Sequence, residues 1–268
     1  MRYALKKDLI GVFLALLFLA SSGLFWEVRP LAFLDHVQSG SGIKVFTANA
    51  PLWYIGQDDA YGQFLKNQNA DIYQLQEMIP PTSTAEPKTE FLKKYFPDYT
   101  IVAHHELVTL TRLPVVAEEY KEGNHFQRVR IKIKGTDVDF FNVHMPIHLI
   151  PWMARSPLDF LSDMKERFAL RSGQFEKLYV AVSQSPNAYV SGDFNTSRMM
   201  GMMRPLLSIT EDSFTASGLY FPVTWDEQKH LWWRIDYSLV KMLKLLSHKT
   251  INQGEYSDHA AVLVEISL

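Results

Sequence analysis

The sequence contains no cysteine and no low-complexity tract. The absence of cysteine excludes disulfide bonds, zinc–thiolate centres and cysteine nucleophiles, and leaves the redox compartment open. Positive charge is not in excess either, because the formal net charge is −2 over 268 residues. No broad basic field therefore indicates a nucleic acid as partner. Hydrophobic residues make up 47% of the chain, which is long enough to bury a substantial core.

Charged residues are also missing from residues 9–26, an apolar run near the lower length limit for crossing a bilayer. Arg2, Lys6 and Lys7 precede this run. A basic flank followed by an apolar segment is typical of an export signal. We therefore predict a signal anchor, or transmembrane segment, over residues 1–27.

A linker is predicted over residues 28–42, which end in Gly- and Ser-rich sequence. The small residues at 20–22 would permit cleavage and secretion, whereas Trp26 at the edge of the apolar run favours a retained anchor. The remainder of the chain is then expected to be membrane-anchored and extracytoplasmic, either periplasmic or extracellular.

Residues 43–268 show no internal repeat and are interpreted as one domain. Apolar residues at helical spacing predict helices around Tyr61 and over residues 163–183. Alternating residues in VRIKIKG, followed by VDFFNVH, predict a β-hairpin. Strands that alternate with helices and also pair as hairpins indicate a mixed α/β sheet protein.

The predicted strands begin or end repeatedly at Asp, Glu, Asn or His. These residues are Asn49, Glu77, His144, Asp193 with Asn195, Asp236, and Asp258 with His259. Strand ends in layered proteins can converge at one rim. Carboxylate and amide oxygens suit Mg²⁺ or Mn²⁺, and a histidine beside an aspartate is an oriented proton carrier. The combination predicts metal-assisted hydrolysis of a phosphate ester.

The motifs LQE, GDFN, RIDY and SDH occur in this order, with Asn49 before them and NVHMP between the first two. In this arrangement the chain resembles the endonuclease/exonuclease/phosphatase superfamily, which has the deoxyribonuclease I fold. The resemblance implies a four-layer α/β/β/α sandwich with two packed, mostly antiparallel sheets. It also implies hydrolysis of a phosphodiester or phosphomonoester with a divalent ion, usually Mg²⁺.

The resemblance implies a role for each matching residue. Glu77 corresponds to the principal Mg²⁺ ligand, Asn49 to the residue beside it that orients ligand or phosphate, and Asp258 to a further metal-proximal carboxylate. Asp193 corresponds to the residue that positions or deprotonates the attacking water, and Asn195 to the one that binds this water and the phosphate.

Two histidines complete the implied site. His259 corresponds to a residue that contacts the scissile phosphate and transfers protons, and Asp236 to the residue that orients it. His144 occupies the place of a phosphate-contacting histidine. The alternatives are a structural histidine for His144 and a salt bridge to Arg234 for Asp236. Arg112, in a Thr-Arg-Leu-Pro stretch, is a candidate for substrate contact, with a plain turn as the alternative.

Several substrates fit this site equally well. A nuclease should carry clustered Lys and Arg, and the chain offers RVRIKIK and the scattered Arg155, Arg167 and Arg171. The predicted anchor and the Met- and Trp-rich stretches favour a phospholipid head group, through an apolar rim beside the site. Among these activities, that of a phosphodiesterase is the one we predict. A phosphomonoesterase of sugar or inositol phosphates and a non-catalytic binding module are the alternatives, and no obligate protein partner is inferred.

Overall fold

The computed structural model describes residues 12–14, 42–50, 58–79, 89–147, 156–216, 223–225 and 233–268. The predicted anchor and linker lie outside these residues apart from 12–14, which are helical and exposed, and Gly42. Among the described residues, no helix combines the length and hydrophobicity that a membrane crossing needs.

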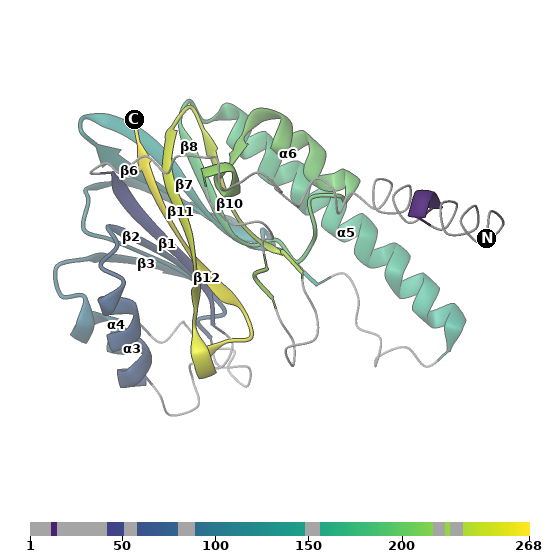
Figure 1. Cartoon of the computed structure of the whole chain (residues 1–268), viewed down its shortest axis with the longest axis horizontal. Helices are drawn as coiled ribbons and strands as arrows, with labels where there is room; N and C mark the ends of the chain where they lie inside the picture. The colour runs from purple at the N-terminus through teal and green to yellow at the C-terminus, as the bar shows by residue number, and fades with distance from the viewer. Residues whose placement is uncertain are drawn as a thin grey trace, which may run out of the picture.

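Two six-stranded sheets pack against each other (Figure 1). The first has the order β11-β12-β1-β2-β4-β3, and the second has the order β5-β6-β7-β8-β10-β9. The strands of the first sheet are β1 (Ile43–Asn49), β2 (Ile72–Gln76), β3 (Thr100–His104), β4 (Leu107–Thr111), β11 (Lys244–Asn252) and β12 (Ala260–Ser267). Those of the second are β5 (Val115–Tyr120), β6 (Phe126–Ile133), β7 (Thr136–His144), β8 (Ala188–Asp193), β9 (Glu211–Asp212) and β10 (Asp236–Lys241).

Each sheet is antiparallel except for one parallel pair, β1 with β2 and β7 with β8. The predicted hairpin is β6–β7, in which Ile133 pairs with Thr136. Lys134 and Gly135 between them have φ angles of 48° and 89°. Two consecutive residues at positive φ are the signature of a type I′ turn, whose twist matches that of the flanking strands.

Helices cover the outer faces of both sheets (Figure 1). The first sheet carries α3 (Asp58–Asn67) and α4 (Glu90–Tyr95), and the second carries α5 (Pro157–Gln184) and α6 (Arg204–Ile209). Short 3₁₀ turns are η3 (Gly201–Met203), η4 (Ser213–Ala216) and η6 (Gly254–Tyr256). The predicted four-layer sandwich of two mostly antiparallel sheets is therefore confirmed.

The core forms three apolar layers, one between the sheets and one under each pair of helices. Val45, Val129 and Val264 belong to the layer between the sheets. Tyr61 of α3 and Leu178 of α5 belong to the two outer layers. Because the sheets are covered on both faces, β2 and β8 are buried at every position and β1 at its last five, including their polar residues.

The helix predicted over residues 163–183 begins six residues earlier, at Pro157. Ser156 provides the N-cap, because its side chain accepts a hydrogen bond from the backbone nitrogen of Asp159 (3.2 Å). Proline in the first helical turn costs little, because its missing N–H would have no intrahelical partner there. The helix thus starts at a cap and not at its first core-facing residue.

Candidate active site

The polar strand ends predicted from the sequence lie at one edge of the sandwich. Parallel pairing of β1 with β2 and of β7 with β8 places the carboxyl ends of these strands side by side. β10 begins at the same edge, because Asp236 pairs with Asp193 across the antiparallel ladder. His144 pairs with Asp193 on its other side. The topology, and not proximity in sequence, brings these groups together.

Asn49 connects the two sheets at this edge. Its Nδ2 atom donates to Oε1 of Glu77 (3.0 Å) and to Oδ2 of Asp193 (3.0 Å). The first carboxylate follows β2 in the sheet of Asn49, and the second ends β8 in the opposite sheet. The orientation of the amide follows from its two carboxylate partners, which can only accept hydrogen bonds when ionised.

The backbone of Asn49 is held as firmly as its side chain. Its carbonyl oxygen accepts hydrogen bonds from Nε2 of Gln253 (2.8 Å) and Oγ of Ser257 (2.6 Å). Gln253 Nε2 also contacts the carbonyl oxygen of His259 (3.0 Å). The sequence did not point to Gln253 or Ser257 as site residues, because both lie in the connection between β11 and β12 and act through the backbone of other residues.

Buried polar side chains support the edge from inside the sandwich. Gln76 of β2 donates to Oδ1 of Asn142 of β7 (2.6 Å), and Ser191 of β8 donates to Oε1 of Gln74 of β2 (2.6 Å). All four residues are fully buried. Paired polar groups in a low-dielectric interior make strong hydrogen bonds, so these links make the spacing of the two sheets rigid beneath the site.

The chain makes sharp turns where the acids emerge. Glu77 and Asn195 have φ angles of 58° and 49°. Asparagine tolerates this left-handed region, whereas it is uncommon for glutamate. A backbone conformation of this kind persists when surrounding contacts impose it, and it often marks a functional site.

The GDFN stretch bends around its own carboxylate. Asp193 Oδ1 accepts the backbone N–H of Asn195 (2.7 Å), and Oδ2 accepts from Nδ2 of Asn195 (3.1 Å). That amide also donates to the carbonyl oxygen of Met145 (2.8 Å). Gly192, at φ 137°, precedes the acid because an added Cβ would lie 1.9 Å from the carbonyl oxygen of Val143. The motif therefore holds a buried carboxylate and an amide at a defined separation.

His259 and Asp236 form a buried pair. Nδ1 of His259 lies 3.0 Å from Oδ2 of Asp236, and Nε2 lies 4.0 Å from Oδ2 of Asp193. Burial opposes the charged form of His259, but the charge and hydrogen bond of Asp236 outweigh it and raise its pKa to about 10. Thr224 supports the pair, because its hydroxyl accepts the backbone N–H of Asp236 (3.1 Å). The alternative salt bridge from Asp236 to Arg234 is not observed, since Arg234 pairs with Asp212.

His144 forms a second pair, with Glu106, a residue that the sequence did not point to. Nδ1 of His144 lies 2.9 Å from Oε1 of Glu106. Nε2 lies 3.6 Å from Glu77 Oε1 and 3.8 Å from Asp193 Oδ2. Burial again opposes the charge, but Glu106, together with Asp193 and Glu77, raises the pKa of His144 to about 9. The only sequence signal for Glu106 was its acidic side chain in the HHEL turn between β3 and β4. Neither of these two strands was predicted.

Asp193 lies at the centre of these groups. Burial, followed by the neighbouring Asp236, raises the pKa of the Asp193 carboxyl to about 6, against the opposing effects of His259 and His144. A carboxyl group with a pKa near neutrality can accept a proton from water more readily than an ordinary aspartate, because its conjugate base is stronger.

Asp258 lies at the margin of the site. Its Oδ1 is 4.0 Å from Nε2 of His259, and its Oδ2 accepts a hydrogen bond from Nε1 of Trp225 (2.9 Å). Its side chain is 38% exposed. Trp225 was not recognised as a site residue, because its contact depends on a β-bridge to His259 formed across the fold.

Two sets of ligands suit a cation here. Asp193, Asp236 and His259 each offer a ligand atom within 4.8 Å of the others. In this triad, however, Nδ1 of His259 is already hydrogen-bonded to Asp236. The second set is the Glu77 carboxylate and the Oδ1 atom of Asn49. In the part of the chain that the structure describes, this Oδ1 atom is buried with no hydrogen-bond partner. A half-exposed carboxylate beside an unpaired amide oxygen fits Mg²⁺, which prefers oxygen ligands and keeps several waters.

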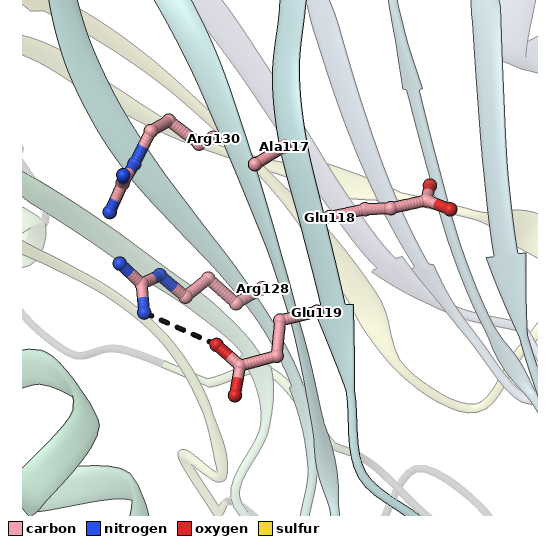
Figure 2. Close-up of a pocket in the computed structure, with 5 residues that line it drawn as sticks. All are labelled: Ala117, Glu118, Glu119, Arg128 and Arg130. Carbon is pink, nitrogen blue, oxygen red and sulfur yellow. Dashed lines mark hydrogen bonds and ion pairs between the residues drawn. The ribbon is translucent and has the colours of Figure 1, made fainter.

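The arginines considered for a nucleic-acid groove are paired or buried. Figure 2 shows Arg128 and Arg130 on the same side of β6, around a pocket of about 330 Å³, with Glu119 reaching Arg128 (3.3 Å). Both arginines also bind the buried Asp139, at 2.8 Å. This cluster is an internal ion-pair network and not a free basic strip.

The other basic candidates that the structure describes are also paired or buried. Arg167 pairs with Asp163 (2.9 Å), and Arg171 is 1% exposed. Arg112 binds Asp71, which precedes β2 at the end opposite Glu77. The interpretation of Arg112 as a substrate contact is therefore wrong, because its side chain lies away from the site. Arg155 falls outside the described residues.

No family model and no curated protein matches this sequence. Solved structures do. An endonuclease/exonuclease/phosphatase family protein from Leptotrichia buccalis aligns with a TM-score of 0.61 and 17% identity, covering 84% of this chain and 100% of the other. The corresponding protein from Bacteroides vulgatus aligns with a TM-score of 0.65, 15% identity, and coverage of 85% and 100%.

Humanized D. rerio TDP2 aligns with a TM-score of 0.66, 14% identity and coverage of 85% and 100%. At these identities the comparison concerns the fold. The resemblance to the endonuclease/exonuclease/phosphatase superfamily that the motifs predict is confirmed at that level: this chain has the deoxyribonuclease I-like sandwich of that superfamily.

Proposed function

We propose that the chain is a Mg²⁺-dependent phosphodiesterase. The observation that carries this proposal is the Asn49 amide, which holds the carboxylates of Glu77 and Asp193 at 3.0 Å each beneath two charged histidines. Acids and an amide that lie beside cationic hydrogen-bond donors suit a phosphate ester under attack by water. A purely binding module has no need of a buried acid with a pKa near 6.

Glu77 and Asn49 would hold the divalent ion, and Asp258, at the margin of the site, would contribute through water; Mn²⁺ suits the same oxygen ligands. When bound, this ion would neutralise charge on the phosphate oxygens. Gln253 and Ser257 both donate hydrogen bonds to the backbone carbonyl oxygen of Asn49. These bonds keep the Asn49 side-chain amide in place as the ligands lose their water.

Asp193 and Asn195 would position the attacking water. The Asp193 carboxylate is held by the backbone and side chain of Asn195, so that its direction is set before substrate binds. A base with a raised pKa can take up the proton of the water at neutral pH. Fixing the nucleophile in line with the leaving group removes much of the entropic cost of attack.

The two histidines would act on the phosphate. His259, charged through its pair with Asp236, would donate to a phosphate oxygen and supply a proton to the leaving alkoxide. His144, charged through Glu106, would donate its Nε2–H to a second oxygen. Both cations are preorganised, since their carboxylate partners fix the ring orientation.

The pairing of the basic residues favours a small or amphiphilic phosphodiester over a nucleic acid. Binding a polynucleotide draws on several unpaired Lys and Arg side chains.

The N-terminal segment, a basic flank followed by an apolar run, supports an anchored, extracytoplasmic enzyme. Sequencing the N-terminus of the mature protein tests this, because a start near Gly23 would mean that the segment is removed.

The test of function is hydrolysis of bis(4-nitrophenyl) phosphate by the full chain, with Mg²⁺ and with chelator. We expect Mg²⁺-dependent release of 4-nitrophenolate that Asp193→Asn abolishes and that Asp137→Asn, in an exposed acid of β7, leaves unchanged. A parallel panel of plasmid DNA, phospholipid and inositol phosphates assigns the substrate class. Absence of turnover on every substrate, with no Mg²⁺ bound, would favour the binding module.

A further inference from the structure

An apolar groove lies beside the site, between α5 and the segment that follows GDFN. Its volume is about 400 Å³, and its lining includes Leu161, Met164, Phe168, Thr196, Met200 and Met202. A hollow of this size is in the range of small-molecule sites. Methionine side chains adapt their shape to varied apolar partners.

The amino-terminal half of α5 supplies one wall and does not pack on the sheet. Described side chains from 158 to 170 are exposed or partly exposed, and regular burial begins at Arg171. Leu161 and Phe168 are each 59% exposed, and Leu158 is 78% exposed. In Figure 1 this half of the helix projects beyond the sheet that its other half covers. Large apolar side chains that share an exposed face mark an interaction surface.

The groove adjoins the loop that carries Asn195. Thr196, in its lining, directly follows Asn195. Arg171, also in the lining, donates to the carbonyl oxygen of Asn195 (3.1 Å) and to that of Pro146. Thr196 Oγ1 and Arg171 Nε are buried without a hydrogen-bond partner among the described residues. The floor of the groove is thus the outer side of the loop that carries the GDFN amide.

A second hollow lies beside Glu106 and has a different lining. It measures about 210 Å³ and its lining includes His105, Glu106, Glu122 and His125. Glu106 is the partner of His144. The lining of this hollow is richer in titratable side chains than that of the groove beside Asn195.

We propose that the groove binds the hydrocarbon chain of an amphiphilic phosphate ester whose phosphate occupies the catalytic centre. This inference rests on the proposed function and narrows its substrate class. A hydrocarbon chain is favoured over a protein partner because the groove opens directly onto the loop at Asn195. The predicted anchor over residues 1–27 would also hold the domain beside a membrane. The apolar rim expected from the sequence is located here, whereas Met203 and Leu206 of the same stretch are buried core.

The test is a series of 4-nitrophenyl alkyl phosphodiesters with methyl, butyl, octyl and decyl groups, used below their micellar concentrations. Attack of water at phosphorus releases 4-nitrophenolate and leaves the alkyl phosphate, so the leaving group is constant. The full chain is held in an amphipathic polymer without free detergent. We expect kcat/KM to rise with chain length, by up to about fourfold per methylene buried.

Leu161→Ser and Phe168→Ser should flatten this dependence, so that the decyl ester loses most of its advantage over the methyl ester. Val180→Ser, on an exposed site of the same helix outside the groove, is the matched control and should retain it. Hydrolysis of all esters at one rate by the wild type would overturn the groove proposal and leave the proposed function intact.

Failure of the wild type to hydrolyse even the methyl ester would count against the proposed function instead. The groove is then tested by titrating methyl and decyl phosphonate into the same proteins. Tighter binding of the decyl compound that Phe168→Ser removes supports the groove, and equal binding overturns it. The proposal is wrong if Phe168→Ser converts a dimer into a monomer in sedimentation and leaves the chain-length dependence intact. The groove would then be the contact surface for a second copy of this chain.

Discussion

His259 Nδ1 lies 3.0 Å from Oδ2 of Asp236, although 23 positions separate them in the chain. The pair is buried, and the Asp236 carboxylate is the main group that raises the pKa of His259 against the effect of burial. This dependence of one group on the other makes the role of Asp236 measurable.

Asp236→Asn should lower kcat on bis(4-nitrophenyl) phosphate by about 10²- to 10³-fold, with a smaller effect on KM, because the imidazole loses the orientation and charge that stabilise the phosphate in the transition state. The measurement is steady-state kinetics, with Asp137→Asn as control. Circular dichroism checks that the fold is retained. A folded Asp236→Asn enzyme with wild-type kcat would refute the assigned role.

Glu77→Gln should weaken Mg²⁺ binding by at least about tenfold, as measured by isothermal titration calorimetry, because the loss of a direct ligand costs at least as much as that of an outer partner. Glu118→Gln, in an exposed acid of β5, serves as control. The alternative triad predicts the reverse pattern: Glu77→Gln would bind Mg²⁺ normally and Asp236→Asn would not.

Gly192→Ala should reduce the free energy of unfolding by more than about 2 kcal/mol or prevent folding, because the new Cβ would overlap the Val143 carbonyl at a positive φ. Gly173→Ala in α5 is the comparison, since a Cβ added there would meet no atom of another described element within 4 Å. There alanine should stabilise by up to about 1 kcal/mol. Urea denaturation measures both, and equal effects would contradict the close approach.

His248 makes stability sensitive to acid. Burial, followed by the charge of Arg234, lowers the pKa of His248 from 6.5 to about 4. Its Nδ1 lies 2.8 Å from the hydroxyl of Ser213. Between these two pKa values the unfolded chain binds a proton that the folded chain does not. Stability should therefore fall as the pH drops through this window, by at most about 3 kcal/mol.

His248→Gln should reduce this acid sensitivity, because glutamine does not titrate. The comparison is the urea midpoint of both proteins at pH 7 and pH 4.5. The same drop in the midpoint for the variant and the wild type would show that other groups account for the loss.

Much of the site was predictable because its strands are self-evident in the sequence. The strands before Glu77, His144 and Asp193 are rich in β-branched and aromatic residues and are buried on both faces, and each has a polar residue at its end. The edge strand β5 escaped prediction because its side chains are largely exposed and carry no apolar pattern. β4 escaped because two of its buried residues are threonines.

The supporting residues were not predictable in the same way. Glu106, Gln253 and Ser257 lie in connections between strands and act on residues that are distant in the chain. Nothing in a loop sequence states which carbonyl or imidazole it will meet. Arg128 and Arg130 likewise form a basic stretch in the sequence that the acid of the neighbouring strand neutralises in the fold.

The sequence by itself determined which chemical groups are present, their order, and the strands whose ends carry them, because polarity and hydrophobic pattern are local properties of a chain. Only the tertiary structure decided which acid pairs with which histidine, which acid pairs with which arginine, and that an apolar groove lies beside Asn195. Those outcomes depend on which strand ends meet across two sheets, and this is a property of the packed chain as a whole.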